Sequence, residues 1–528
     1  MSRPLKLIFK TLKKMKKNYT LIGILLIGMM SFAQAPSILW SYSLPDKMGR
    51  TVSPAVASDG TVYIGCSYTT RNTSTVGTTP PNFFAIKNGL KMWEQSLTES
   101  NGTKVDDILS SASIHPDGSI YTGGFFGRIV FKLDKTTGAI VSNLPIGSRQ
   151  RYTAPIYSSD GNTVYVCGYN NNDKGVRSLS SDLTTQNWVF KPNDLAVDFN
   201  CTPAVSTDGT IYAASGNAAG DNKLFAINPD GTQKWASTSL VNFVSSAIAI
   251  GTDGTIYLSA KLNAVVSPTL PNGCLKAFNP IDGSEKWSVT FTDSNAEQGG
   301  PAIADNGTIY LGSIGGRMRA FNPANGTELW QYPLASNPAI GQIEVVPAID
   351  NNGKIYFGTT GTTGGGMFYV LNSDGTEAYT PLSLGTSITS SAAIGSDGKI
   401  YVAATDSGVG KLYALQTNAT GLASGGWPMY AGNEKHVGNI SIITLSTDVN
   451  SIDGLSIYPN PAQNGEFYVS TTNNETKSVK IFDVLGKQVY SKRIEGNEKI
   501  KTSNLDSGIY ILKVEENGKV ATRKMIIN

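Results

Sequence analysis

The sequence predicts an all-β chain, an eight-bladed β-propeller followed by a small Ig-like β-sandwich. Three observations support this prediction. One strand–turn–strand unit returns eight times, 56 glycines and 24 prolines favour turn-rich structure, and only 16% of the 528 residues are charged. Coiled coils and helical repeats need charged, glycine-poor sequences, so this composition argues against them. The length leaves room for about two to four domains.

The N-terminus has the pattern of a secretory signal peptide, assigned to residues 1–33. This segment contains seven Lys/Arg and no acidic residue, and an apolar run at 21–30 is followed by small residues. We expect cleavage after Ala33, while the start of translation, Met1 or Met15, stays open. The apolar run is too short for a transmembrane helix, so none is expected in the mature chain.

The charge balance argues against a nucleic-acid partner. The formal net charge is +3, but without the leader 36 basic residues face 40 acidic ones. Such a chain has no bulk attraction for a polyanion such as DNA. The only histidines, His115 and His436, are too few for a histidine-rich metal site, and we expect no metal. His115 lies in an Ile-His-Pro-Asp-Gly turn and is expected to be solvated.

The repeated unit is a hairpin centred on a glycine. Ser53-Pro-Ala-Val-Ala-Ser-Asp-Gly60-Thr-Val-Tyr-Ile-Gly65 is the first copy. Further copies centre on Gly118, Gly161, Gly209, Gly254, Gly307, Gly353 and Gly398, with a mean spacing of about 48 residues. Each has an Asp-Gly or similar turn, which accepts positive φ, between an apolar strand and a β-branched or aromatic strand.

A second hairpin that ends on tryptophan follows most copies, as in Leu224-Phe-Ala-Ile-Asn-Pro-Asp-Gly-Thr-Gln-Lys-Trp235. Each unit therefore holds four antiparallel strands, A to D, which is the form of a propeller blade. The tryptophans that close units in this way are Trp93, Trp188, Trp235, Trp287 and Trp330. Trp40 has the same place with no unit before it, so we expect strand Ile38–Leu44 to complete the eighth blade and close the ring.

These motifs resemble the quinoprotein-like (PQQ-like) propeller repeats shared by quinohaemoprotein dehydrogenases and BamB-like outer-membrane assembly factors. The resemblance covers residues 37–432 and implies the fold rather than an activity. The dehydrogenases place a vicinal cysteine pair against their quinone, whereas Cys66, Cys167, Cys201 and Cys274 are all separated here. We find no catalytic motif and expect neither an enzyme nor a cofactor. A Cys167–Cys201 bridge and four buried free thiols both stay open.

After a linker at 433–451, residues 452–528 carry short alternating strands. Tyr458-Pro-Asn-Pro461, Val479-Lys-Ile-Phe-Asp-Val-Leu-Gly-Lys487 and Leu505-Asp-Ser-Gly-Ile-Tyr510 resemble, in order and spacing, the type A C-terminal sorting domain of type IX secretion. The motif residues are Pro459, Asn460, Pro461, Gly486, Gly508 and Tyr510. The resemblance implies an address that the outer-membrane translocon reads, and hence a protein secreted from, or displayed on, a Gram-negative bacterium.

We therefore expect an exported binding or scaffold protein whose propeller presents a polar ligand or a protein partner. The alternatives are a secreted enzyme that uses loop carboxylates or a quinone cofactor, and a BamB-like outer-membrane assembly scaffold. The A–B and C–D turns are tight, whereas the D–A and B–C connections vary, and variable loops on a rigid scaffold are where binding residues usually lie. The candidates form a mixed-charge rim on the D–A connections: Asp106, Asp107, Arg149, Arg151, Asp194, Asp198, Glu297 and Glu344.

Overall fold

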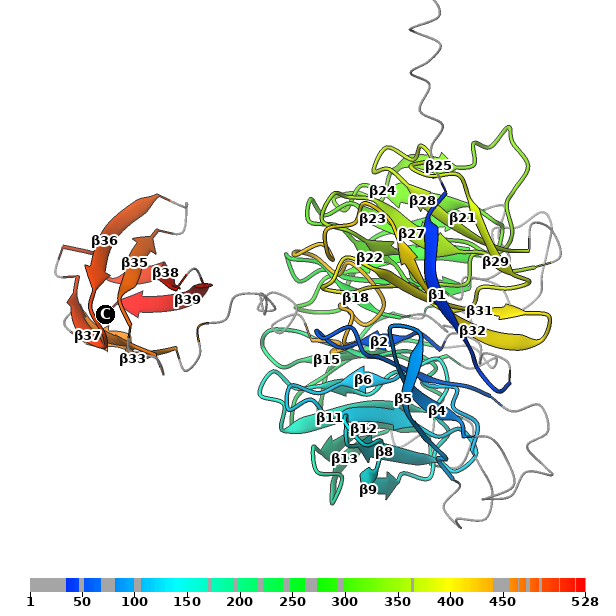
Figure 1. The fold of residues 1–528 in the computed structure, drawn as a ribbon, viewed down its shortest axis with the longest axis horizontal. Helices are drawn as coiled ribbons and strands as arrows, with labels where there is room; N and C mark the ends of the chain where they lie inside the picture. Colours follow the sequence, from blue (N-terminus) through cyan, green and yellow to red (C-terminus); the bar gives the residue numbers. More distant parts are fainter. Residues whose placement is uncertain are drawn as a thin grey trace, which may run out of the picture. The chain divides into compact units, whose positions relative to one another are not determined.

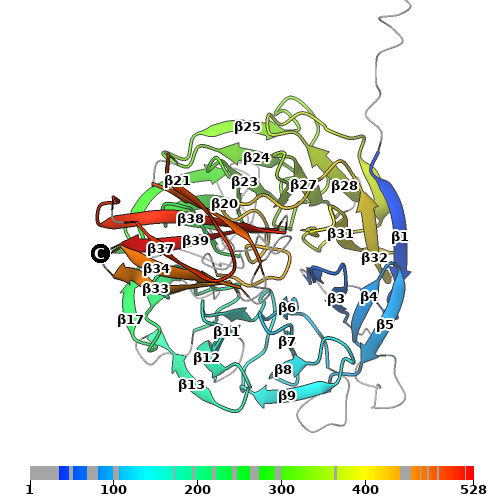
Figure 2. The same ribbon diagram turned by 60° about the vertical axis from the view of Figure 1, so that its left-hand side comes forward.

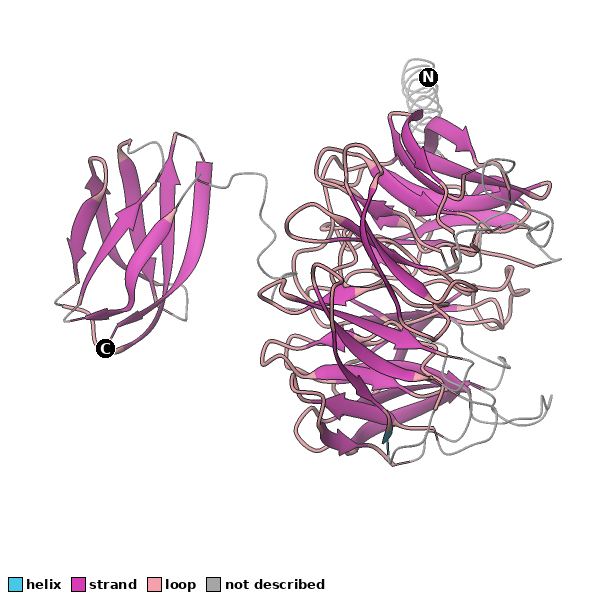
Figure 3. Ribbon diagram, turned by 90° about the horizontal axis from the view of Figure 1, so that it is seen from below, coloured by secondary structure: helices cyan, strands magenta, loops and turns pink. Residues whose placement is uncertain are grey.

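The structure, a computed structural model, is all-β and divides into two compact units, Met1–Thr444 and Leu445–Asn528. It describes residues 35–46, 52–67, 81–98, 106–169, 173–192, 197–216, 222–238, 240, 247–261, 273–291, 299–361, 365–439, 452, 455–463, 465–471, 475–483, 487–502, 504–517 and 519–527. These residues form 39 strands and no α-helix (Figure 3). The expected signal peptide, with its cleavage site at Ala33, lies outside them. No helix in the described ranges is long and apolar enough to cross a membrane.

The first unit consists of eight four-stranded sheets, each with its strands in the order A-B-C-D from the inside outward (Figure 1). Blade 1 comprises β2 (Ala55–Val56), β3 (Val62–Gly65), β4 (Phe83–Lys87) and β5 (Leu90–Gln95). Blade 2 comprises β6 (Ser113–Ile114), β7 (Ile120–Gly123), β8 (Ile129–Leu133) and β9 (Ile140–Pro145). Blade 3 comprises β10 (Ile156–Tyr157), β11 (Thr163–Gly168), β12 (Gly175–Ser180) and β13 (Gln186–Phe190). Blade 4 comprises β14 (Ala204–Val205), β15 (Ile211–Ala214), β16 (Leu224–Ile227) and β17 (Gln233–Ala236).

The remaining four blades repeat this order. Blade 5 comprises β18 (Ala249–Ile250), β19 (Ile256–Lys261), β20 (Gly273–Phe278) and β21 (Glu285–Phe291). Blade 6 comprises β22 (Ala302–Ile303), β23 (Ile309–Gly312), β24 (Met318–Phe321) and β25 (Glu328–Tyr332). Blade 7 comprises β26 (Ala348–Ile349), β27 (Ile355–Gly358), β28 (Gly366–Leu371) and β29 (Leu382–Gly385). Blade 8 comprises β30 (Ala393–Ile394), β31 (Ile400–Asp406), β32 (Val409–Gln416) and the first strand of the chain, β1 (Ser37–Ser43).

The ring closes as the orphan tryptophan strand predicts. Strand β1 pairs antiparallel with β32, so Trp40 lies opposite Ala414 (Figure 2). The Trp40 ring lies 5.9 Å from the ring of Tyr401 in the same blade and packs against Gly89 of blade 1. Blade 8 is therefore built from both ends of the propeller sequence, and the eight-bladed prediction is confirmed.

At six of the eight interfaces between blades, one tryptophan packs on one glycine of the next blade. The Trp235 indole N–H donates to the Pro280 carbonyl of the next blade at 2.9 Å. A Cβ added to Gly283, in the same turn, would lie 2.4 Å from Trp235 Cε3, and its φ is +72°. Glycine is needed there both for the backbone conformation and for the approach of the ring. The same N–H bond runs from Trp93 to Lys135, from Trp188 to Pro229, from Trp287 to Pro323 and from Trp330 to Ser373.

The central channel is filled by residues 421–439, which we call the plug. The inner A strands would otherwise present an unpaired edge to the channel, and the plug supplies partners for six of them. The A-strand N–H donors and their plug acceptors are Val56 to Glu434, Ile114 to Lys435, Tyr157 to Val437, Val205 to Gly438, Ile303 to Trp427 and Ile349 to Pro428, at 2.7–3.2 Å. Trp427 is the largest fully buried side chain.

The plug corrects the expected start of the linker. Residue 433 was the expected first linker residue, but Asn433, His436 and Asn439 are buried within the propeller. His436 Nδ1 lies 2.7 Å from the Ala112 carbonyl, and Asn439 donates to the Tyr157 carbonyl at 3.1 Å. The segment lacks strand periodicity because its hydrogen-bond partners lie on six different blades rather than on one neighbouring strand.

The second unit is a seven-stranded sheet in the order β36-β35-β38-β39-β33-β34-β37. The strands are β33 (Ser456–Gln463), β34 (Glu466–Ser470), β35 (Lys477–Phe482), β36 (Gln488–Ile494), β37 (Glu498–Lys501), β38 (Gly508–Glu516) and β39 (Lys519–Ile527). Its core includes Phe467, Val479 and Leu512, all fully buried, and the architecture agrees with the predicted sandwich. Motif residues 459–461 lie in β33, Gly508 begins β38, and Gly486 lies outside the described residues.

Candidate functional site

The two faces of the propeller differ in construction. On one face lie the A–B and C–D turns, which are closed by short backbone bonds such as Gly60 N–H to Ala57 and Gly231 N–H to Asn228, both at 2.9 Å. On the other lie the D–A connections, which are longer, and the B–C connections, which are short turns in blades 2, 6 and 8 and longer in the other blades. We call these the turn face and the loop face. A rigid scaffold with its variable chain on one face directs the search for a site to the loop face.

Asp106, one of the candidate rim residues, does not reach the surface. Its side chain is fully buried and accepts backbone N–H bonds from Phe126 at 2.8 Å, Gly127 at 2.9 Å and Asp107 at 2.8 Å. Burial raises the pKa of this carboxyl to about 7, although the three N–H donors lower it. Asp106 therefore holds the B–C turn of blade 2 in place, which corrects its expected role as a ligand contact.

The other candidates separate by burial. Asp107 and Glu344 are buried, which also corrects their expected place on the rim. Arg149, Arg151 and Asp198 are half-buried, and Asp198 forms an ion pair with Lys174 at 3.3 Å. Asp194 and Glu297 lie outside the described residues. Of the described candidates, the arginines are the ones left at the surface without a carboxylate partner.

Arg149 and Arg151 belong to a cluster that the charge pattern alone did not indicate. The Arg149 guanidinium carbon lies 5.0 Å from the Phe125 ring centroid and 5.2 Å from that of Phe126. The Arg151 guanidinium lies 4.2 Å from the ring of Tyr152 and donates to its hydroxyl. We call these five residues the arginine cluster. The sequence signal for it is Gly123-Gly-Phe-Phe-Gly127, two adjacent aromatic residues in a B–C connection.

Backbone bonds between four connections hold the cluster in place. Arg149 forms an antiparallel bridge with Tyr169, with two N–H···O bonds of 3.2 Å. The Phe125 N–H donates to the Asp107 carbonyl at 3.0 Å, and the Tyr152 N–H donates to the Leu109 carbonyl at 3.3 Å. The loops that carry the rings and the guanidinium groups are thus fixed to blades 2 and 3.

At the loop-face ends of the inner strands, hydroxyl side chains link neighbouring blades. Ser53 N–H donates to Ser111 Oγ at 2.9 Å, and Ser391 N–H donates to Ser53 Oγ at 3.1 Å. The plug residue Tyr430 reaches this ring, where its hydroxyl lies 2.7 Å from Thr202 Oγ1.

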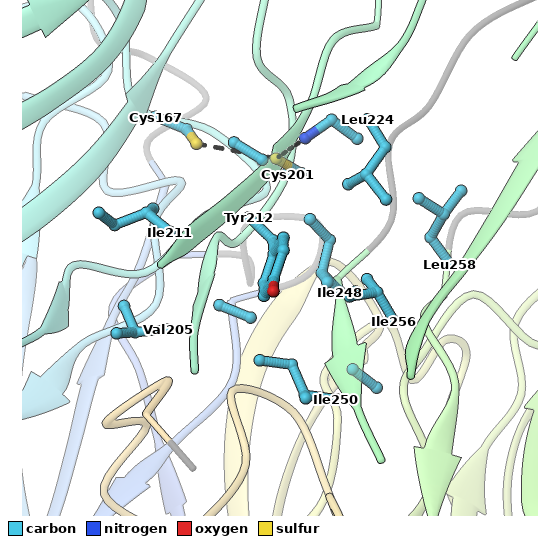
Figure 4. Packing of buried hydrophobic residues seen from close by; sticks show 14 of the residues in the cluster. Cys167, Cys201, Val205, Ile211, Tyr212, Leu224, Ile248, Ile250, Ile256 and Leu258 are labelled. Atoms are coloured by element: carbon cyan, nitrogen blue, oxygen red, sulfur yellow. Dashed lines mark hydrogen bonds between the residues drawn. The ribbon is translucent and has the colours of Figure 1, made fainter. Parts of the chain in front are cut away.

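The cysteines do not fit a quinone site. All four are buried free thiols, and the pair shown in Figure 4, Cys167 and Cys201, has its sulfur atoms 3.7 Å apart inside the core. These two residues are 34 positions apart and lie among apolar side chains of blades 3 and 4. They cannot present the vicinal pair that the dehydrogenases place against their cofactor.

His115 is buried, although the sequence predicted that it would be solvated. It is buried between blades 2 and 3, with its ring 5.6 Å from Tyr121 and 4.9 Å from Tyr157. Its Nε2 lies 2.7 Å from the Gly161 carbonyl. The turn in which it lies packs against the following blade, so its role is in the interface between blades.

Family comparisons agree with both halves of the chain. Residues 456–528 match the secretion system C-terminal sorting domain, and residues 172–417 match the family of the outer membrane protein assembly factor BamB. Ulvan lyase NLR42 of Nonlabens ulvanivorans is 39% identical over 93 residues. The chain spans 17% of the length of that curated relative, and the match covers 17% of this chain.

Three solved structures are similar to this chain. The C-terminal WD40 domain of Sif2 covers 73% of this chain and 100% of its own, with a TM-score of 0.51 and 13% identity. BamB from Moraxella catarrhalis covers 72% of this chain and 98% of its own, with a TM-score of 0.48 and 16% identity. Quinohemoprotein alcohol dehydrogenase from Comamonas testosteroni covers 72% and 76%, with a TM-score of 0.48 and 14% identity.

These matches support the same assignment as the blade topology and the sequence motifs of both units. At such identities the solved structures speak for the fold alone, and the Sif2 domain carries that comparison. The BamB-type repeats and the sorting domain were each expected from the sequence, and both are confirmed. The sorting domain marks the protein for export by type IX secretion. The chain therefore carries BamB-type repeats at residues 172–417, within an eight-bladed propeller, and a secretion system C-terminal sorting domain at residues 456–528.

Proposed function

We propose that this protein is released to the medium or held at the cell surface, where its loop face binds a polar ligand or partner. The observation that carries the proposal is the contrast between the two faces: short hydrogen-bonded turns on one, and on the other long connections with half-buried charged and aromatic side chains. The tight turns leave little chain with which to recognise a ligand. A binding role needs no catalytic group.

The export half of the proposal is tested by removing the address. A chain truncated before Leu455 should fold its propeller and remain in the periplasm, because the sorting domain, not the propeller, specifies passage through the outer membrane. The full chain is the control and should be recovered outside the cell with the sorting domain removed. Normal amounts of the truncated chain outside the cell would refute this reading.

The face that binds is tested by blocking each face in turn. The four natural cysteines are buried, so a single added cysteine can be coupled selectively to a maleimide polymer. Gln342→Cys and Ser407→Cys place the polymer on exposed loop-face positions, and Asp282→Cys and Asp374→Cys place it on exposed C–D turns. Retention on immobilised polysaccharides, including ulvan, neutral dextran and polygalacturonate, is then measured.

We expect polymer on the loop face to abolish retention and polymer on the turn face to leave it unchanged. The opposite pattern would show that the propeller uses the turn face. The partial match to ulvan lyase gives the enzyme alternative one specific test. Release of shorter products from ulvan by the purified chain would favour that alternative over binding alone.

A further inference from the structure

We propose that the arginine cluster, Phe125, Phe126, Arg149, Arg151 and Tyr152, is a binding site for an acidic saccharide chain. The proposal rests on the proposed function and names its ligand class: a polysaccharide that carries carboxylate or sulfate groups. The two guanidinium groups would hold the oxyanions, and the partly exposed rings beside them would contact the apolar faces of the sugar rings.

The guanidinium groups are positioned before any ligand binds. The Arg149 guanidinium carbon lies over Phe125 and Phe126, whose ring planes are 86° apart, and the Arg151 guanidinium carbon lies over Tyr152, at 4.2–5.2 Å from the ring centroids. These contacts restrict both side chains, and an arginine binds a planar oxyanion through two parallel hydrogen bonds from N–H groups that remain available. Less side-chain freedom is then lost on binding, which raises affinity.

Neither guanidinium is neutralised within the described part of the chain. Nearby cations of blade 3 all have carboxylate partners: Lys174 pairs with Asp198 at 3.3 Å, and Arg177 and Lys191 pair with Asp173 at 2.9 and 3.1 Å. Arg149 and Arg151 form no such pair, and Arg149 Nε is a buried donor without a hydrogen-bond partner. Two cations on the same loop that have no counter-ion among the described residues favour an anionic ligand.

The acidic residues expected beside them are turned away. Asp106 and Asp107 are buried, and Asp106 directs both carboxylate oxygens to the backbone N–H groups of residues 107, 126 and 127. The same bonds hold the turn that carries Phe125 and Phe126. Asp106 is thus a positioning residue: it fixes the turn that carries Phe125 and Phe126, and its carboxylate does not face the arginines.

The ligand class follows from the charge balance of the chain and from the aromatic rings at the site. Beyond its leader the chain has 36 basic and 40 acidic residues, so a densely charged polymer such as a nucleic acid is not attracted to the molecule as a whole. An acidic saccharide chain combines carboxylate or sulfate groups, which a local pair of arginines can bind, with sugar rings that have apolar faces. Half-buried Phe126 and Tyr169 offer apolar surface that a bare anion would not need.

The test uses the full chain without its leader and measures affinity by calorimetry. The probes are polygalacturonate, which carries carboxylates, dextran sulfate, which carries sulfates, unsubstituted dextran, poly-glutamate and single-stranded DNA. The variants are Arg149→Gln, Arg151→Gln, the double variant and Arg149→Lys. The matched control is Lys135→Gln, which removes the same charge from an exposed C–D turn of blade 2 on the turn face.

We expect the double variant to lose at least tenfold in affinity for an acidic saccharide, with the carboxylate and sulfate probes showing which oxyanion fits. Arg149→Lys should recover only part of the loss, because lysine keeps the charge but not the planar N–H edge. Lys135→Gln should stay within twofold of the parent chain. Unchanged melting of the variants will show that the blades are intact, and Arg151→Gln covers the case in which an Arg149 variant fails to fold.

Equal losses in Lys135→Gln and Arg149→Gln would overturn the proposal, since they indicate attraction to charge in general. Arginine-dependent binding of poly-glutamate or DNA without binding of acidic saccharides would overturn the ligand class. Acidic saccharides could bind, with polymer at residue 342 or 407 blocking that binding and the arginine variants leaving it unchanged. The proposed site would then be wrong, while the loop-face function would stand. Loss only with polymer on the turn face would refute the proposed function itself.

Discussion

Removal of the second half of the plug should destabilise the propeller strongly. We compare a chain that ends after Gly432, where the sequence predicted the propeller to end, with one that ends after Thr444, where the first compact unit ends. The shorter chain loses the acceptors for four inner-strand N–H groups, on Val56, Ile114, Tyr157 and Val205. Both chains lack the sorting domain, so its loss does not enter the comparison.

The expected magnitude follows from those four hydrogen bonds. A backbone hydrogen bond contributes about 0.5–1.5 kcal/mol net of water, so four contribute about 2–6 kcal/mol. Water that enters the emptied channel can solvate the freed groups, which is why the net rather than the gross value applies. Buried Val437 and His436 are removed as well, so the loss should not fall below this range.

Urea denaturation and amide hydrogen exchange measure the effect. We expect a lower urea midpoint for the shorter chain, together with loss of protection at the four inner-strand amides. A chain that ends after Asn439 is the control and should match the longer chain, because it retains all six plug-to-blade bonds. Equal midpoints and equal protection for the chains ending at 432 and 444 would show that the plug is a linker resting in the channel.

Three further predictions concern the ring and its pH dependence. In urea denaturation, Gly283→Ala should lower the free energy of unfolding more than Gly408→Ala. Both glycines have positive φ, but a new Cβ at Gly283 would lie 2.4 Å from Trp235, whereas nothing lies within 4 Å of a Cβ at Gly408. Equal losses would contradict the role of Gly283 in blade packing. His436→Asn should reduce acid destabilisation. Burial lowers the pKa of His436 to about 4. Its contribution to the free energy of unfolding, about 3 kcal/mol, is therefore fully present above the unfolded-state pKa of about 6.5 and is lost as the pH falls to about 4. Other titrating groups are present in both chains, so identical profiles of stability against pH would refute this assignment. Deletion of β1 should lower the melting temperature and raise hydrogen exchange in β32, which loses its outer partner; an unchanged β32 would show that the ring does not depend on this closure.

The blades could be predicted because their signals are local. A turn that needs positive φ requires glycine at a fixed offset from the strands it joins, as at Gly60 and Gly283, and eight copies of such a turn make the repeat visible without coordinates. Trp40 was assigned to the last blade because a tryptophan closes five other units and Trp40 has no unit before it. The structure confirms this assignment, since Trp40 packs against Gly89 of blade 1. The sorting motifs are likewise short and ordered along one segment.

The sequence predicted which face carries the variable connections, but not which residues of that face are exposed to a ligand. A carboxylate in a variable connection looks the same in the sequence whether it meets solvent or backbone. Asp106 is buried because residues 126 and 127, on another connection, bring two N–H groups to it. Arg149 is fixed by rings some twenty positions away along the chain. Loop–loop packing decides both, and it has no periodicity in the sequence.

The blade unit, the number of blades, the closure of the ring and the export address follow from the amino-acid sequence, since each depends on residues close together or on a repeated pattern. Which segment fills the channel and which charges face solvent follow only from the folded chain. The plug has no regular pattern because its partners, from Val56 to Ile349, are distributed around the ring. Their unpaired inner edges exist only once the blades have assembled, and the free energy of pairing those edges gives residues 421–439 their place in the fold.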